Sequence, residues 1–240
     1  MVEVRRNVPA PAEYPVTLYI NGQEYVSVQA TPADLEDFAL GFLLTEGIVR
    51  SPAGISGLVA TDRGIIWIDL APENRPPAPA GLISDRDRGI AAEGSARLSP
   101  VPPGITVSPR DLAAWVGRMA QEAIRYRETR GIHACLIARP AFGEWLVRED
   151  IGRHNAVDKA IGAALRRGWD GPETVVCTSG RISYEMCVKA ARFGTGIVAS
   201  RTAATDMACD LADRLGMDLV GYVRTATRYT LYTSGRRLAG

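Results

Sequence analysis

The first seventy residues alternate between hydrophobic and polar positions in a way that predicts a β-hairpin. Val16, Leu18 and Ile20 occupy every second position, as expected of a strand with one buried face. Asn21-Gly22 follows them, and both residues readily adopt the positive φ angles that a type I′ turn requires. The pattern therefore predicts a hairpin over residues 14–29.

A helix and a second pair of strands are expected next. Apolar residues at helical spacing predict a helix over residues 31–47, with Thr31 as its N-cap: Leu35, Phe38, Ala39, Phe42 and Leu43. Residues 55–60 and 65–70 then resemble two strands around the turn at residues 61–64.

The second half of the chain alternates helices with strands. Helices are predicted from Ser108 to about residue 124, and over residues 155–167, 183–193 and 205–215. Strands are predicted over residues 132–138, 144–147, 175–178, 196–199, 218–223 and 229–233. This order indicates an α/β fold with parallel strand pairs. We divide the chain into a small N-terminal α+β domain (1–72), a proline-rich linker (73–107) and an α/β domain (108–240).

Composition narrows the classes of partner. The 240 residues are 46% hydrophobic and carry a net charge of +1, so no global basic excess favours nucleic acid. No apolar run approaches the ~20 residues that span a bilayer, so we expect no membrane partner and a cytoplasmic location. The cysteines form no C-x-x-C pair, and we expect four free, mostly buried thiols and no zinc site: Cys135, Cys177, Cys187 and Cys209.

Three predicted loops each connect a strand to a helix and contain polar residues suited to an anion. They cover residues 148–155, 178–183 and 200–205. In α/β sheets, ligands bind beyond the carboxyl ends of strands, where helix N-termini and arginines can hold phosphate. The alternative for each loop is an ordinary solvated surface, and spacing cannot choose between the two interpretations. Glu149 and Asp150 could serve as acid or base, or could pair with Arg148 and Arg153; His154 and His133 are more typical of structural histidines.

Residues 221–233 form a predicted strand, bend and strand with aromatic, arginine and hydroxyl side chains. They could stack a base and hold a phosphate, or form an ordinary hairpin. Several enzyme classes lack their motifs here, because the chain has no P-loop, Rossmann glycine pattern, G-x-S-x-G elbow or zinc-deaminase ligand set.

One long motif resembles a known family. Val147-Arg-Glu-Asp-Ile-Gly-Arg-His-Asn-Ala-Val-Asp-Lys159 is similar to the signature of the formate dehydrogenase accessory sulfurtransferase family, FdhD. Shorter matches follow the same order along the chain: Thr31-Pro32 with Asp34, Gly41-Phe-Leu-Leu-Thr-Glu-Gly-Ile48, His133-Ala134, Ser179-Gly-Arg-Ile-Ser183 with Glu185 and Lys189-Ala190, and Gly221-Tyr-Val-Arg224 with Tyr232-Thr233.

The resemblance implies a C-terminal domain of cytidine-deaminase-like fold and a homodimer. It implies sulfur transfer from a cysteine desulfurase to the molybdenum bis(molybdopterin guanine dinucleotide) cofactor, which is bound as cargo through its guanine nucleotide ends and serves formate dehydrogenase. The family's cofactor-binding stretch corresponds to residues 222–227. Together with the loops, the predicted contact set is Arg148, Asp150, Arg153, His154, Asn155, Asp158, Lys159, Ser179, Gly180, Arg181, Ser183, Ser200, Thr205, Tyr222, Val223, Arg224, Thr225, Ala226 and Thr227.

The sequence departs from that family where its persulfide cysteines are expected. The corresponding region, Ile83 to Gly94, contains no sulfur, and Ser, Asp and Arg cannot form a persulfide. No catalytic residue is therefore assigned. Three functions stay open: a sulfur carrier of the usual kind, a non-catalytic protein that carries the molybdenum cofactor or docks on the dehydrogenase, and a nucleotide-sensing scaffold on a reused fold.

Overall fold

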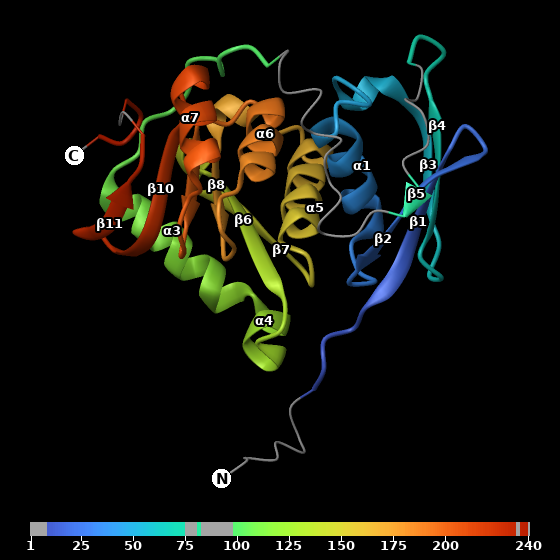
Figure 1. The fold of residues 1–240 in the computed structure, drawn as a ribbon, viewed down its shortest axis with the longest axis horizontal. Helices are drawn as coiled ribbons and strands as arrows, with labels where there is room; N and C mark the ends of the chain where they lie inside the picture. The colour runs from blue at the N-terminus through green and yellow to red at the C-terminus, as the bar shows by residue number, and fades with distance from the viewer. Residues whose placement is uncertain (1–8, 75–80, 83–97, 234–235, 240) are drawn as a thin grey trace.

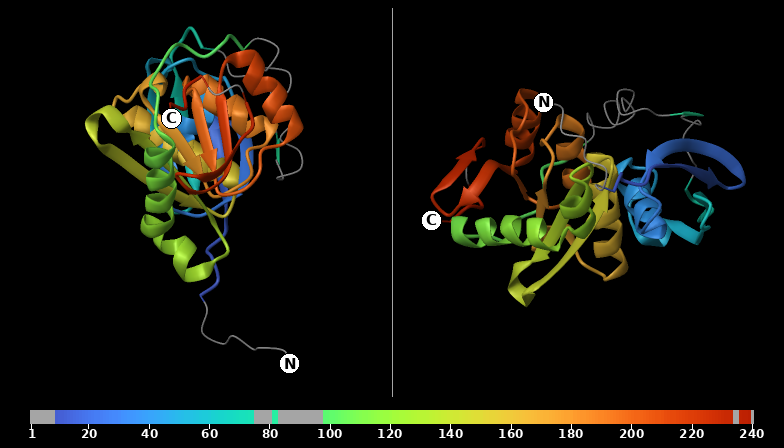
Figure 2. Two further views of the ribbon diagram at one scale, coloured as in Figure 1. Left: turned by 90° about the vertical axis from the view of Figure 1, so that its left-hand side faces the viewer. Right: turned by 90° about the horizontal axis from the view of Figure 1, so that it is seen from below.

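Two β-sheets stand at opposite ends of the protein, with helices between them (Figure 1). The structure is a computed structural model, and it describes residues 9–74, 81–82, 98–233 and 236–239. Seen from below in Figure 2, the helices α1 (Leu35–Thr45) and α5 (Arg153–Arg166) lie between the sheets. The α/β class expected from the sequence is confirmed.

The first sheet contains the two predicted strand pairs. Its order is β3-β4-β1-β2-β5, with β1 (Tyr14–Ile20), β2 (Gln23–Ala30), β3 (Ile55–Ala60), β4 (Ile65–Leu70) and β5 (Gly81–Leu82). Asn21 and Gly22 both have positive φ, 49° and 79°, as the predicted turn requires. β5 lies within the predicted linker, and the division into domains stays a prediction.

Helix α1 covers one face of this sheet. Phe38, Phe42 and Leu43 pack against Leu18 and Ile66 in a core made of residues 16–70. The predicted N-cap was wrong, because the helix begins at Leu35 and Asp34 occupies the N-cap position. The Thr31 hydroxyl instead accepts a hydrogen bond from the Ile151 backbone N–H, at 3.1 Å.

The second sheet has the order β11-β10-β9-β8-β6-β7. Its strands are β6 (His133–Arg139), β7 (Glu144–Asp150), β8 (Val175–Thr178), β9 (Ile197–Ser200), β10 (Asp218–Thr225) and β11 (Arg228–Leu231). β8, β9 and β10 run parallel, so their carboxyl ends meet at one edge of the sheet. β6 is antiparallel to β8, and β7 and β11 are antiparallel edge strands.

Helices cover both faces of this second sheet. α5, α6 (Tyr184–Phe193) and α7 (Asp206–Leu215) pack on one face, whereas α3 (Pro109–Glu122) packs on the other. Ser108 caps α3, because its hydroxyl accepts the backbone N–H of Asp111 at 3.1 Å. The short helix α4 (Ile124–Thr129) follows and projects below the sheet (Figure 1). Among the described residues, no helix combines the length and the apolar character needed to cross a bilayer.

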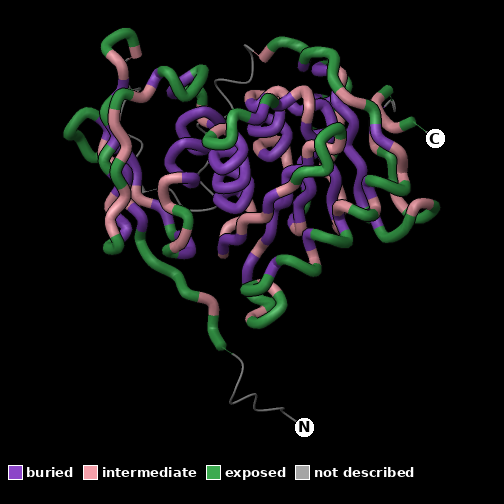
Figure 3. Tube along the Cα trace, turned by 180° about the vertical axis from the view of Figure 1, so that it is seen from behind, coloured by how far each residue is buried: buried purple, intermediate pink, exposed green. Residues whose placement is uncertain are grey.

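The helices α1 and α5 approach each other closely, and Figure 3 shows this region as largely buried. A Cβ atom on Gly41 would overlap the Asp158 carbonyl oxygen, and one on Gly162 would overlap the Asp37 carbonyl oxygen. Only glycine permits so close a backbone contact at these two positions. The contact joins the two sheets through their helices.

Candidate functional site

The loops that follow β8 and β9 lie side by side at one edge of the six-stranded sheet. The Ile182 backbone N–H donates to the Ala203 carbonyl, and the Thr205 N–H donates to the Ile182 carbonyl, both at 3.0 Å. The Ser200 hydroxyl donates to the Gly180 carbonyl at 2.6 Å. Two of the three predicted loops are thus held together by backbone contacts.

The end of β10 joins the same edge. The Tyr222 backbone N–H donates to the Thr202 carbonyl at 3.0 Å, and the Arg224 guanidinium donates to the Arg201 carbonyl at 2.7 Å. The predicted segment 222–227 is therefore attached to the loop that follows β9.

Tyr222 has an unusual backbone conformation. Its φ is 50°, a left-handed value that costs free energy for a residue with a side chain. The pairing of β10 with β11 shifts register between Gly221 and Thr225. A Cβ on Gly221 would lie only 2.7 Å from the Thr202 carbonyl oxygen, so a glycine fits this close approach. Strained backbone of this kind is common at functional sites, and the binding role of this segment stays a prediction.

The start of α5 reaches this edge through Arg153. A Cβ on Gly180 would lie 3.0 Å from the Arg153 Cβ and 3.4 Å from His133 Nδ1. The neighbouring Ser179 hydroxyl accepts the Ala134 backbone N–H at 3.0 Å and lies 3.2 Å from His133 Nδ1. His133 is thus a hydrogen-bonded, partly buried residue, as expected.

The predicted contact residues divide into a group at the loop edge and a group that lies elsewhere in the protein. The loop edge contains Arg153, Ser179, Gly180, Arg181, Ser183, Ser200, Thr205, Tyr222, Val223, Arg224, Thr225, Ala226 and Thr227. Arg181, Tyr222, Arg224, Thr225 and Thr227 are exposed there, whereas Gly180 and Ser200 are buried. Val223 packs into the core on the α3 face, so its side chain is excluded from the edge.

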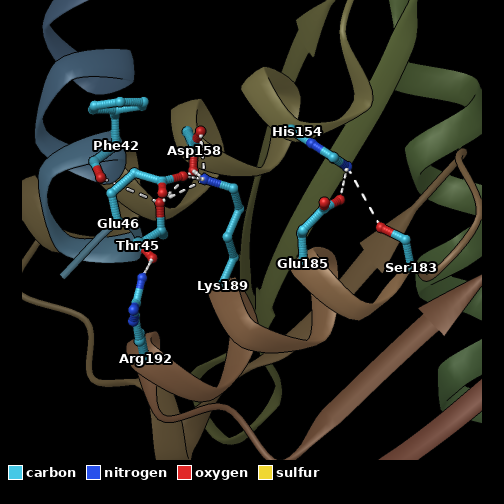
Figure 4. Close-up of polar contacts among 9 residues, drawn as sticks. All are labelled: Phe42, Thr45, Glu46, His154, Asp158, Ser183, Glu185, Lys189 and Arg192. Atoms are coloured by element: carbon cyan, nitrogen blue, oxygen red, sulfur yellow. Dashed lines mark hydrogen bonds and ion pairs between the residues drawn. The ribbon is translucent and has the colours of Figure 1, made fainter. Parts of the chain in front are cut away.

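His154 bridges the first turns of α5 and α6 (Figure 4). It is fully buried, and its Nε2 lies 3.5 Å from both the Ser183 hydroxyl and a Glu185 carboxylate oxygen. These contacts fix the start of α6 against α5. The geometry matches the structural role expected of this histidine.

Four further predicted residues require a correction, because the structure places them away from the loop edge. Asp150, Asn155, Asp158 and Lys159 are buried against the N-terminal half of the chain. Asp150 pairs with Lys159 at 2.6 Å and accepts the Thr31 backbone N–H at 3.0 Å. Lys159 in turn donates to the Thr31 carbonyl at 2.8 Å. These side chains hold the two halves together and are not available to a ligand.

Lys189 forms a second buried ion cluster between α1, α5 and α6 (Figure 4). Its ammonium lies 2.8 Å from an Asp158 oxygen, 2.7 Å from a Glu46 oxygen and 2.9 Å from the Thr45 hydroxyl. The Arg192 guanidinium donates to the Thr45 carbonyl. The sequence motif contained Asp158 but gave no sign of partners more than a hundred residues away.

Arg148 and Glu149 were also predicted in the wrong structural context, because β7 continues to Asp150. Arg148 pairs with Asp37 on α1 at 2.7 Å and is therefore removed from the candidate site. Glu149 is buried and accepts the backbone N–H groups of Arg125 and Tyr126 at 3.1 and 2.7 Å. It stabilises the start of α4, and neither acid–base chemistry nor pairing with Arg153 describes its contacts.

The four thiols occupy environments that suppress ionisation. Cys135 and Cys177 are fully buried in β6 and β8, and burial raises the pKa of both thiols. Burial raises the pKa of Cys187 to about 12. Cys209 is partly exposed, and its pKa is raised by partial burial and by Asp213, Asp210 and Asp206. The thiolate that sulfur chemistry needs is disfavoured at every cysteine.

Comparison with known proteins shows which family this chain belongs to. The sequence profile described as the FdhD/NarQ family matches residues 11–239. The chain belongs to the FdhD/NarQ family. It is 32% identical to the sulfur carrier protein FdhD of Geobacillus kaustophilus (strain HTA426), over 94% of this chain and 88% of that protein. It is 37% identical to the sulfur carrier protein FdhD of Xanthomonas campestris pv. campestris (strain B100), over 89% and 80%.

A solved structure from the same group has a similar fold. The crystal structure described as a formate dehydrogenase accessory protein from Desulfotalea psychrophila superimposes with a TM-score of 0.80 and 25% identity. The match covers 96% of this chain and 90% of that one. The present chain has no C-x-x-C pair. Its segment 83–94, which contains no cysteine, lies outside the described residues.

Proposed function

We propose that this protein is a formate dehydrogenase accessory factor that binds the molybdenum bis(molybdopterin guanine dinucleotide) cofactor as cargo. The names of its FdhD relatives support the accessory role. The observation that supports the binding role is the hydrogen-bonded edge formed by the loops after β8, β9 and β10. We further propose that the protein is cytoplasmic and homodimeric.

The proposed site suits a guanine nucleotide end. Arg181 and Arg224 are exposed at the edge. Arg201, in the loop after β9, is half-buried. Guanidinium groups bind phosphate oxygens through two parallel hydrogen bonds. The helices α6 and α7 begin at the same edge and direct their positive dipole ends toward it. Tyr222, with 48% of its surface exposed, offers an aromatic face for the guanine base.

We propose that this copy delivers cargo without carrying sulfur itself. Sulfur transfer would require a thiolate to attack the terminal sulfur of a donor persulfide and release the donor thiolate. The three buried thiols are inaccessible to such a donor, and their raised pKa disfavours the nucleophilic form. The retained loop edge and the missing nucleophile together favour a carrier over a sulfurtransferase.

Calorimetry with GDP tests the binding role. We expect the intact protein to bind GDP, and Arg181→Ala or Arg224→Ala to weaken binding by about tenfold or more, since each removes a charge-assisted contact. Arg63→Ala is the matched control, because Arg63 is exposed in the turn between β3 and β4, in the other sheet. Absence of GDP binding by the intact protein would contradict the proposal.

Sulfur carriage is the second candidate, because the curated relatives are named sulfur carriers. Cys209 is the thiol with partial exposure, so it is the residue on which this candidate depends. Incubation with a cysteine desulfurase and radiolabelled cysteine distinguishes the two functions. We expect no label on the protein; label that disappears in Cys209→Ser would establish sulfur carriage instead.

A further inference from the structure

The strand β3 forms an open edge of the five-stranded sheet. It pairs with β4 on one side, and no described residue pairs with its other side. An edge strand presents unpaired backbone N–H and C=O groups, which attract another extended chain. Proteins commonly protect such edges with charged residues, proline or bulges. The strand Ile55–Ala60 contains no charge and no proline, and its one bulge lies at the beginning, between Ile55 and Gly57.

A cavity lies beside this edge on the inner face of the sheet. Its volume is about 300 Å³, and its apolar lining comes from Leu40, Pro52, Ile55 and Leu58. Glu36 and Arg166 also line it and pair with each other at 3.1 Å. The cavity is therefore an apolar recess in which the two charged side chains neutralise each other. It can receive an apolar side chain from a strand beside β3.

The outer face of the same sheet carries an exposed hydrophobic row. Val59, Trp67 and Tyr19 stand side by side on β3, β4 and β1, since Trp67 pairs in register with both of the others. The rings of Tyr19 and Trp67 stack with centroids 4.4 Å apart. Val59 is 60% exposed and Trp67 is 45% exposed. Exposed clusters of this kind mark interaction surfaces, and tryptophan and tyrosine often contribute most of the binding energy.

The charges around the row indicate the chemistry of the partner. Glu24 lies at the end of the row, where its carboxylate accepts from the Tyr19 hydroxyl at 3.4 Å. Asp69 is exposed two residues beyond Trp67 on β4 and therefore on the same face. Glu24 is on β2, three strands from β3, whereas the Asp69 carboxylate reaches over Gly57 of β3. Asp69 therefore favours a cationic side chain on a strand beside β3, and that side chain would also lie near Trp67.

We propose that β3 is a docking site for an extended segment of the client formate dehydrogenase, which adds to the sheet as a further strand. The segment has an apolar side chain for the recess and a lysine or arginine on the opposite face for Trp67 and Asp69. Backbone pairing with β3 supplies affinity, and the alternating side chains supply selectivity. This inference rests on the proposed function, because the client is the enzyme that the accessory role implies.

The test measures binding of purified formate dehydrogenase from the same organism by biolayer interferometry, with GDP binding measured in parallel. Val59→Lys adds a charge to the edge at a position that is 60% exposed, so the fold tolerates it. Trp67→Ala removes the centre of the row. Phe142→Lys is the matched control, because Phe142 is 57% exposed in the turn before β7, in the other sheet.

We expect Val59→Lys and Trp67→Ala to weaken the complex by about tenfold or more, and Phe142→Lys to leave it within about twofold. Hydrogen exchange should slow in residues 55–60 when the complex forms. Wild-type affinity in Val59→Lys with intact GDP binding would overturn the docking site and leave the proposed function standing. If the wild-type protein does not bind GDP, the proposed function is contradicted instead. Should Val59→Lys change only the protein's own oligomeric state, the occupant is a second copy and the inference fails.

Discussion

The contact between α1 and α5 and the loop edge beyond β8, β9 and β10 use similar residues for opposite purposes. Both contain glycines and arginines. At the helix contact the charges are buried or half-buried and reach partners in the N-terminal half of the chain: Arg148 pairs with Asp37, Lys189 with Glu46, and Lys159 donates to the Thr31 carbonyl. At the loop edge Arg181 and Arg224 are exposed, and Arg224 donates to the Arg201 and Val223 carbonyls.

Burial and partners therefore distinguish charged residues that stabilise the fold from those that can bind a ligand. A buried lysine surrounded by carboxylates, such as Lys189, is satisfied by the protein and stabilises the assembly of its helices. An exposed arginine such as Arg181, next to the glycine that Arg153 approaches closely, retains its capacity to bind an anion. Substitutions in the first region should therefore affect stability, and those in the second should affect binding.

The largest effect is expected at the crossing of α1 and α5. Gly162→Ala places a methyl group on the Asp37 carbonyl, and neither backbone can move without separating the helices. We expect a loss of about 5 kcal/mol in the free energy of unfolding, at the extreme for a single substitution. Gly117→Ala is the control, because that glycine lies in α3 with open space around it. It should stabilise the protein by about 0.5–1 kcal/mol, and urea unfolding measures both.

The buried ion cluster is expected to show the next largest effect. Lys189→Met leaves Asp158 and Glu46 without their shared cation, and we expect destabilisation of about 3–5 kcal/mol. Adding Asp158→Asn to this variant should recover part of the loss, because it removes one of the unpaired buried charges. Thermal unfolding of the single and double variants would contradict the account if Lys189→Met unfolded like the wild type.

Alkaline pH should weaken the protein through its buried thiols and Tyr25. Burial raises the pKa of Cys187 to about 12, and burial with the nearby Glu46 raises the pKa of Tyr25 to about 12. The unfolded chain loses these protons at lower pH, so the stability they contribute is complete below about pH 8 and declines toward pH 12. Each group contributes a slope of about 1.4 kcal/mol per pH unit between its two pKa values.

Lys159 and Arg192 act in the opposite sense, because burial lowers the pKa of both cations, but they are two groups against three buried thiols and Tyr25. Denaturant unfolding as a function of pH measures the sum. Cys187→Ala should reduce the alkaline slope; an unchanged slope in that variant would show that the thiol does not control it.

The smallest stability effect is expected at the loop edge. Arg181→Ala removes an exposed side chain that makes no ion pair with the described residues, so the free energy of unfolding should change by less than about 0.5 kcal/mol. GDP affinity should fall all the same. A stability loss comparable to that of Lys189→Met would remove the distinction between the two regions.

Local sequence patterns predicted most elements of this fold but not their long-range contacts. The strands β3, β4 and β8 begin and end where alternation and apolar runs placed them. Thr31 misled the prediction because its hydroxyl bonds a backbone N–H 120 residues away. The charges of Arg148 and Asp150 predict a loop at the end of β7, whereas their partners on α1 and α5 allow both residues to lie within the strand.

The candidate site was predictable only in part, because part of it depends on contacts between residues far apart in the sequence. Parallel β8, β9 and β10 follow from the alternation of strands and helices, which brings residues 178–183, 200–205 and 222–227 to one edge. The roles of Asp150, Asp158 and Lys159 depend on where α1 packs, and spacing within the motif contains no information about that contact.

A crystal structure of the protein with GDP tests the binding site most directly. We expect phosphate oxygens within hydrogen-bond distance of Arg181 or Arg224, with the base beside Tyr222. GDP bound at another surface, with these three side chains facing solvent, would contradict it.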